Sequence, residues 1–147
     1  MNIQTKYHGE ITIDNDNLLT FPQGIPGFNN EKEFVLLELQ YNSVFQVLQS
    51  TITPTLGFIV VNPYHIYHTY AFDLDDHTIE ALEINSADQV KVASIVSLKE
   101  PFEKSTINLQ APIIINQVNK LAKQYITNEK SHLIKAPIQP SELEREG

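Results

Sequence analysis

Short runs in which apolar and polar side chains alternate recur along this chain, and they limit its fold more than any other feature. In such a run every second side chain points to the same face, so one face is buried and the other meets water. The clearest run extends from Ile107 to Ile115. Together the runs predict extended segments at residues 3–7, 11–13, 18–21, 34–39, 44–48, 90–98 and 107–115, and a continuous apolar run predicts another at residues 57–61. Residues 64–72 place their aromatic side chains on one face if that segment is extended.

The segments between these runs carry turn and helix signals. Asp14-Asn15-Asp16-Asn17 predicts a turn, because short polar side chains hydrogen-bond to their own backbone. Acidic residues precede Ile79, Leu82 and good helix formers. Acids at this place stabilise the start of a helix, so the pattern predicts one short helix from Asp76 to Ile84.

The whole pattern predicts a mainly β protein with a compact, single-domain antiparallel fold, a barrel or a sandwich, and one short helix. Pro112 lacks an amide donor, so it marks an edge, a bulge or a break between two strands. Residues 117–126 fit a helix or a strand equally. We expect residues 1–136 to form the domain and residues 137–147, with two prolines and a charged end, to form a mobile tail.

Charge is unevenly distributed along the chain, whose net charge is −8. Residues 7–90 hold twelve acids against one base, Lys32. Residues 91–135 reverse this balance, with seven lysines against three glutamates. An acidic half repels nucleic acid and attracts a basic protein. The alternative is that the acids serve only to keep the protein soluble. We therefore expect protein partners and no direct contact with nucleic acid.

Composition argues against several classes of protein. The chain has no cysteine, which excludes disulfides, thiolate metal sites and a cysteine nucleophile. No apolar run approaches the roughly 20 residues that a membrane span needs. The first residues lack the pattern of a signal peptide. We expect a cytoplasmic protein that does not contact a membrane and is monomeric when unbound.

No motif of enzyme chemistry is present. Asp73-Leu74-Asp75-Asp76-His77 resembles the start of a calcium loop, but Ile84 stands where a bidentate glutamate belongs. His65 and His68 would point to opposite faces of a strand, which disfavours a shared metal ion. We predict a binding protein with neither cofactor nor metal. A small β-barrel enzyme and a nucleic-acid-binding barrel are the alternatives.

The most distinctive segment is Phe21-Pro22-Gln23-Gly24-Ile25-Pro26-Gly27-Phe28. Within it, Pro26 suits the second position of a type II turn and Gly27 accepts the positive φ of the third. Its three large apolar side chains are expected to anchor the loop on the core. The segment fits either a rigid connection or a presented binding loop. Its candidate site residues are Phe21, Pro22, Gly24, Pro26, Gly27 and Phe28.

Together with later segments, this loop resembles the FliW family of flagellar assembly factors. The loop is similar to the F-P-x-G-I-P-G-F motif of that family, and residues 108–116 resemble its N-L-x-A-P-I-x-x-N motif. Residues 48–50, 58–63 and 122–124 resemble further blocks in the same order. The order and spacing agree from about Ile3 to Ile134.

The resemblance implies a barrel-like domain with two protein partners. One is flagellin, held before export. The other is CsrA, a small dimeric RNA-binding protein that blocks translation of flagellin messenger RNA. In that scheme FliW sequesters CsrA until flagellin takes FliW away, so translation follows secretion. A partner basic enough to bind RNA agrees with the acidic half of this chain.

Two further groups of candidate residues complete the hypothesis. The acids at the expected helix are our candidates for contact with CsrA: Asp73, Asp75, Asp76, Glu80 and Glu83. A solvated helix with a favourable dipole is the alternative for them. The residues of the resembling blocks that we expect to act structurally are Asn62, Pro63, Asn108, Pro112 and Asn116.

Overall fold

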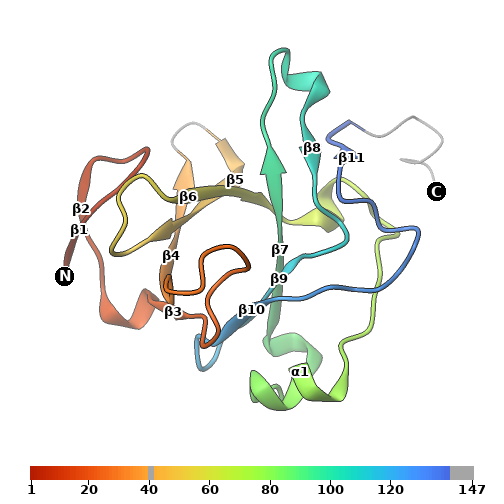
Figure 1. The fold of residues 1–147 in the computed structure, drawn as a ribbon, viewed down its shortest axis with the longest axis horizontal. Coiled ribbons are helices and arrows are strands. Elements are labelled where there is room, and N and C mark those ends of the chain that lie inside the picture. The colour runs from red at the N-terminus through yellow and green to blue at the C-terminus, as the bar shows by residue number, and fades with distance from the viewer. Residues whose placement is uncertain (40–41, 140–147) are drawn as a thin grey trace.

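The computed structural model describes residues 1–39 and 42–139, and strands dominate it (Figure 1). The described residues contain one α-helix, α1 (Asp76–Ala81). Four 3-10 helices are η1 (Asn15–Asn17), η2 (Pro63–His65), η3 (Ala87–Gln89) and η4 (Phe102–Lys104). The strands are β1 (Asn2–Gln4), β2 (Glu10–Thr12), β3 (Leu19–Thr20), β4 (Glu33–Leu39), β5 (Asn42–Ser50), β6 (Gly57–Val61), β7 (Val90–Ser97), β8 (Thr106–Ile107), β9 (Ile113–Asn116), β10 (Ala122–Gln124) and β11 (Ala136–Pro137).

The main sheet closes on itself. Its strands run antiparallel in the order β10-β9-β7-β6-β5-β4-β3, and β8 pairs with both β7 and β11. Thr20 of β3 donates its amide to the Lys120 carbonyl at 2.8 Å and forms a parallel bridge with Leu121. This bridge joins the two end strands. The prediction of a mainly β, antiparallel, barrel-like domain is confirmed.

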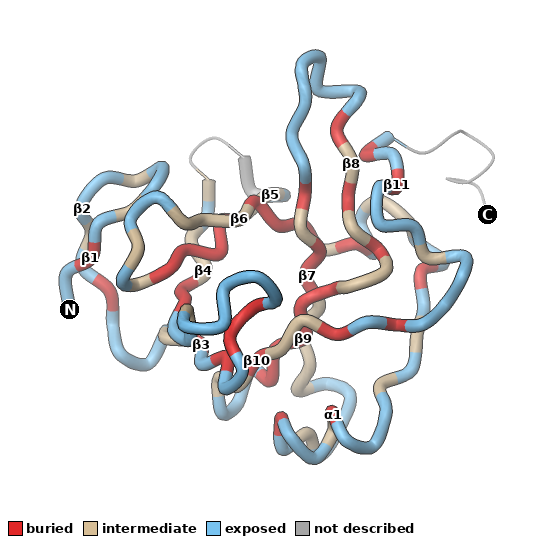
Figure 2. Tube along the Cα trace, in the orientation of Figure 1, coloured by how far each residue is buried: buried red, intermediate tan, exposed pale blue. Residues whose placement is uncertain are grey.

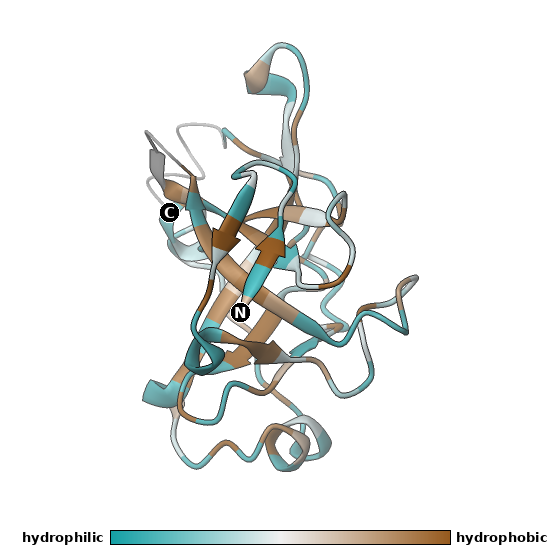
Figure 3. Cartoon of the chain, turned by 90° about the vertical axis from the view of Figure 1, so that its left-hand side faces the viewer, coloured by the Kyte–Doolittle hydropathy of each residue, from teal (hydrophilic) through white to brown (hydrophobic). Residues whose placement is uncertain are grey.

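Apolar side chains from nearly every strand fill the closed sheet, where buried positions gather (Figure 2). The rings of Phe21 and Phe34 meet edge to face, with centroids 5.2 Å apart. Ile113 of β9 belongs to this core, whereas its neighbour Ile114 packs outside the sheet against Leu82, next to α1. The helical segment therefore covers the outer face of β9. Figure 3 shows the apolar colouring concentrated on the crossing strands.

The first predicted segments form a hairpin rather than one continuous strand. β1 pairs antiparallel with β2, and Gly9 takes a φ of 66° in the turn between them. The hairpin packs through Ile3 and Ile13 against Val35 of β4. The predicted segments 34–39, 57–61 and 90–98 appear as β4, β6 and β7, with bounds that agree within one residue.

Residues 64–72 do not form an extended segment. Pro63 opens η2 there, and the Asn62 side chain accepts the Tyr64 amide at 2.9 Å. A second turn follows, in which the Tyr70 amide donates to the Tyr67 carbonyl at 3.0 Å. These local hydrogen bonds hold the backbone in turns, although its aromatic residues alternate as in a strand.

Helix α1 ends at Ala81, three residues before the predicted end. Glu83 adopts a positive φ of 53°. Its amide donates to the Glu80 carbonyl, and the Ile84 amide reaches the Ile79 carbonyl at 2.9 Å. These bonds form a Schellman motif, which terminates a helix. Glu83 therefore lies beyond the helix, although the predicted helix of residues 76–84 included it.

The two ambiguous segments resolve as a break and a strand. Pro112 separates β8 from β9, so it marks a break between strands. Within residues 117–126 the chain turns at Lys120, with a φ of 64°, and then forms β10. Of the expected tail, Pro137 lies in β11, Ile138 is buried, and residues 140–147 lie outside the described part. None of the described helices is long and apolar enough to cross a membrane.

Candidate protein-binding site

The loop between β3 and β4 contains the predicted type II turn. Gly27 has a φ of 88°, and the Phe28 amide donates to the Ile25 carbonyl at 2.6 Å. Phe21 and Ile25 are buried, so two of the three expected anchors reach the core. Phe28 stays 42% exposed, although its ring meets Phe58 edge to face. The loop thus presents one aromatic ring while its base is fixed.

Gly24 shapes the same loop by close backbone approach. It has a φ of 69°, and a Cβ at this position would lie 2.6 Å from the Asn29 carbonyl oxygen. A Cβ at Gly27 would meet no atom within 4 Å. Gly27 is therefore required only for its positive φ, whereas at Gly24 a side chain would also clash with the backbone.

A polar network fixes the end of the loop to the turn after β5. The Glu31 carboxylate accepts hydrogen bonds from the hydroxyls of Ser50 and Thr53. The neighbouring Gln49, fully buried, accepts the Lys6 amide at 2.9 Å and donates to the Leu56 carbonyl at 3.1 Å. Sequence reasoning missed the roles of Glu31 and Gln49, because only the fold reveals their distant partners.

The start of α1 is capped and tied to β10. Asp75 accepts the Thr78 amide at 2.8 Å, so the acids here mark a helix start, as predicted. The hydrogen bond from the Thr78 amide lowers the pKa of Asp75, and the nearby Lys123 ammonium lowers it further. The Tyr125 hydroxyl accepts the Asp75 amide and donates to the Asp73 carbonyl at 3.0 Å.

The end of α1 is held by two asparagines of the β9–β10 connection. The buried Asn116 donates to the carbonyls of Leu82, at 2.8 Å, and Glu83, at 3.2 Å. Asn119 donates to the same Leu82 carbonyl at 3.1 Å. Sequence reasoning singled out Asn116 and missed Asn119. The helix is thus fixed at its end by a residue 34 positions away and at its start by a residue 52 positions away in sequence.

Asn108 and Pro112 shape the connection between β8 and β9. The Asn108 side chain accepts the amides of Gln110, at 3.1 Å, and Ala111, at 3.0 Å. The Pro112 carbonyl accepts the Tyr125 amide at 2.8 Å. Both contacts lie within the fold and order the backbone between the two strands.

A cleft of about 300 Å³, which we call the motif cleft, lies between the loop and α1. The loop and the end of α1 form two of its walls, and β10 contributes a third. Its apolar lining comes from Pro22, Gly24, Pro26, Ala81, Leu82 and Ala122. Its polar lining comes from Gln23, Asn29, Lys123 and Gln124. The structure therefore brings together the loop and the helix, which the sequence presents as separate candidates.

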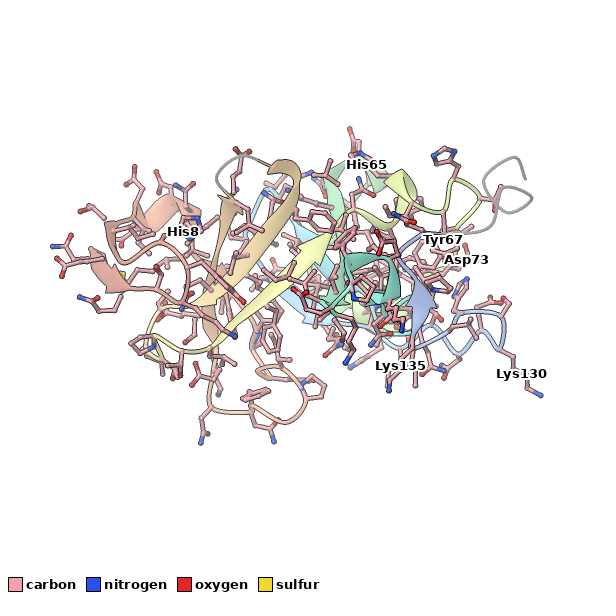
Figure 4. All side chains as sticks on the ribbon, turned by 90° about the horizontal axis from the view of Figure 1, so that it is seen from above. His8, His65, Tyr67, Asp73, Lys130 and Lys135 are labelled. Carbon is pink, nitrogen blue, oxygen red and sulfur yellow. The ribbon has the colours of Figure 1, made fainter. Side chains whose placement is uncertain are left out.

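The five candidate acids form an exposed surface at α1, which we call the acidic surface: Asp73, Asp75, Asp76, Glu80 and Glu83. No lysine or arginine interrupts residues 73–83. Asp73 lies at the opposite end of the molecule from His8 of the β1–β2 hairpin (Figure 4). Among the described residues, no group of three histidine or acidic side chains has the geometry to hold a metal ion.

The profile of a protein family described as FliW protein matches residues 2–138. The chain belongs to the FliW family. Similar proteins named flagellar assembly factor FliW include one from Oceanobacillus iheyensis, 52% identical over 97% of both chains. Another, from Bacillus subtilis, is 47% identical over 94% of this chain and 96% of its own length.

A crystal structure of the flagellar assembly factor FliW has the same fold as this FliW family member. It is 43% identical and superimposes with a TM-score of 0.91 over 97% of this chain and 99% of its own. The resemblance inferred from the motifs is therefore confirmed. The relatives are named as assembly factors, which agrees with a binding protein rather than an enzyme.

Proposed function

We propose that this FliW family member regulates flagellar assembly by binding two proteins in the cytoplasm. It sequesters the RNA-binding regulator CsrA, and it binds flagellin, so that flagellin translation follows flagellin secretion. The names of its relatives support the role in flagellar assembly. The observation that carries the CsrA contact is the acidic surface, a set of exposed carboxylates on and beside a helix that is held at both ends.

The acidic surface acts first on the rate of encounter. A field of one sign steers an oppositely charged protein toward it, and salt screens such a field over about 8–10 Å. Because hydrogen bonds from Tyr125 and Asn116 fix both ends of α1, the carboxylates need little reordering on binding. A basic protein therefore associates fast at low salt.

The regulatory step is an exchange of partners. While CsrA is held by this chain, it is withheld from flagellin messenger RNA. Flagellin then competes for the chain, and its concentration decides which complex forms. We expect the flagellin contact to be more apolar and less sensitive to salt than the CsrA contact.

Purified chain, CsrA and flagellin test this function directly. We expect the chain to form a complex with CsrA in size-exclusion chromatography and to release CsrA from flagellin leader RNA in gel-shift assays. Added flagellin should restore the CsrA–RNA band. Separate elution of CsrA and the chain, together with an unchanged gel shift, would contradict the proposal.

A further inference from the structure

We propose that the motif cleft is an anchor site that takes one large apolar side chain, of the size of leucine, methionine or phenylalanine, from the basic protein that binds the acidic surface. This inference rests on the proposed function. It adds the contact that gives the complex its lifetime, whereas the acidic surface governs the rate of encounter.

The size and lining of the cleft suit a side chain rather than a cofactor. Its volume of about 300 Å³ is at the lower limit of the roughly 300–1,000 Å³ of small-molecule pockets. Pro22 and Pro26 line it from the loop, and Ala81 and the buried Leu82 line it from the end of α1. Buried apolar anchors in such pockets dominate the energy of many protein interfaces.

Both walls are preformed. On one side, Gly24 lies so close to the Asn29 backbone that the loop leaves no space for a Cβ. On the other side, Asn116 and Asn119 both donate to the Leu82 carbonyl, which fixes the end of the helix. A pocket that exists before binding spares the partner the cost of ordering it.

A loop that only connects β3 to β4 needs no such cleft. The segments with the most distinctive sequence nevertheless meet there: residues 22–24, 26 and 122–124 line it, and Asn116 positions its helical wall. This convergence favours the binding role of the loop over that of a plain connection.

Charge complementarity selects the basic partner as the occupant. Glu80 and Glu83, both exposed, flank Ala81 and Leu82 of the cleft wall in sequence, so this wall belongs to the acidic surface. Lys123, the cation of the lining, is near enough to Asp75 to lower the pKa of that carboxyl. The occupant is therefore an apolar side chain flanked by lysine or arginine, which fits CsrA better than flagellin.

Two tryptophan substitutions fill the cleft from opposite walls. Ala81→Trp does so from the helix and Gln23→Trp from the loop, and both residues are exposed, so the fold should tolerate them. Ala71→Trp is the matched control, an exposed alanine outside the cleft. Melting temperatures check that each variant folds, and either filling variant suffices if the other unfolds.

The readout is the affinity for CsrA and for flagellin by titration calorimetry, at low and high salt. We expect both filling variants to weaken CsrA binding by about tenfold or more at either salt concentration, because an apolar contact is not screened. Ala71→Trp should keep the parent affinity, and flagellin binding should persist in all variants.

The other outcomes separate the two proposals. If the parent binds CsrA and neither filling variant weakens it, the anchor site is wrong and the proposed function stands. If the filling variants weaken only flagellin binding, the cleft belongs to flagellin and the assignment of its occupant is overturned. If the parent does not bind CsrA at all, the proposed function fails, and the anchor site fails with it.

Discussion

The two principal walls of the motif cleft are built by different physical means. The loop wall depends on its own residues: buried Phe21 and Ile25 anchor it, and Gly24 permits its sharp return. The helix wall has six residues, too few for a stable helix in isolation. It depends on distant residues, because Asn116 and Tyr125 supply the hydrogen bonds at its two ends. Local sequence thus specifies one wall, and tertiary structure specifies the other.

The largest expected effect comes from the loop wall. Gly24→Val should lower the free energy of unfolding by about 3–5 kcal/mol, because strain at positive φ adds to a backbone clash. Gly27→Val should cost about 1–3 kcal/mol, since only strain acts there. Denaturant unfolding of both variants measures the difference. If both variants lose the same free energy of unfolding, Gly24 has no steric role. If Gly27→Val changes neither the melting temperature nor partner binding, the turn assignment is wrong.

The next effect comes from the helix wall. Asn116→Ala should lower the free energy of unfolding by about 2 kcal/mol, because two buried donors are lost from the helix end. Asn108→Ala should cost about 1 kcal/mol, since its partners are two amides at a half-buried site. Asn116→Asp is the matched control, because it keeps an acceptor for the Val118 amide at 3.0 Å but loses both donors.

Thermal unfolding of these three variants gives the comparison. Asn116→Asp should destabilise at least as much as Asn116→Ala if the donors matter, because its buried carboxylate would face the carbonyls of Leu82 and Glu83. A clear loss of partner binding at unchanged stability would instead make these asparagines contact residues.

Local signals in the sequence were enough to predict several strands and the start of α1. Apolar patterning predicted β4 and β7, a continuous apolar run predicted β6, and the acids before Ile79 predicted the helix start. The helix end was missed because Glu83, rather than a glycine, takes the positive φ. Asn116 and Asn119, which bind the Leu82 carbonyl beside it, lie more than 30 residues away.

The motif cleft itself could not be predicted from sequence. Its walls come from residues 22–29, 81–82 and 122–124, which meet only because the bridge between Thr20 and Leu121 closes the sheet. Each candidate was visible as a local pattern, but their proximity is a property of the fold. The aromatic alternation of residues 64–72 suggested a strand for the same reason. In the structure this segment is irregular: the Tyr70 ring packs against Phe72 and His132, and the Phe72 ring packs against Tyr125.

The smallest effect concerns the cap of α1 and depends on pH. Hydrogen bonding by Thr78 lowers the pKa of Asp75 in the folded chain. The cap therefore adds stability above the pKa of the unfolded carboxyl, and this stability is lost as pH falls through the folded pKa. Asp75→Asn keeps an acceptor but does not titrate. Melting temperatures of parent and variant should converge as the solution is acidified. A difference that persists unchanged in acid would contradict the charged cap.

The rate of association with CsrA tests the central claim most directly. In stopped-flow experiments, the double variant Asp76→Lys/Glu80→Lys is compared with the parent and with Asp14→Lys/Asp16→Lys, which changes the net charge equally at exposed acids beside the β1–β2 hairpin. At low salt the α1 variant should associate about tenfold or more slowly, high salt should reduce the difference, and flagellin binding should persist. Equal association rates for the α1 variant and the parent at low salt would remove the acidic surface from the interface and leave its charge to solubility alone.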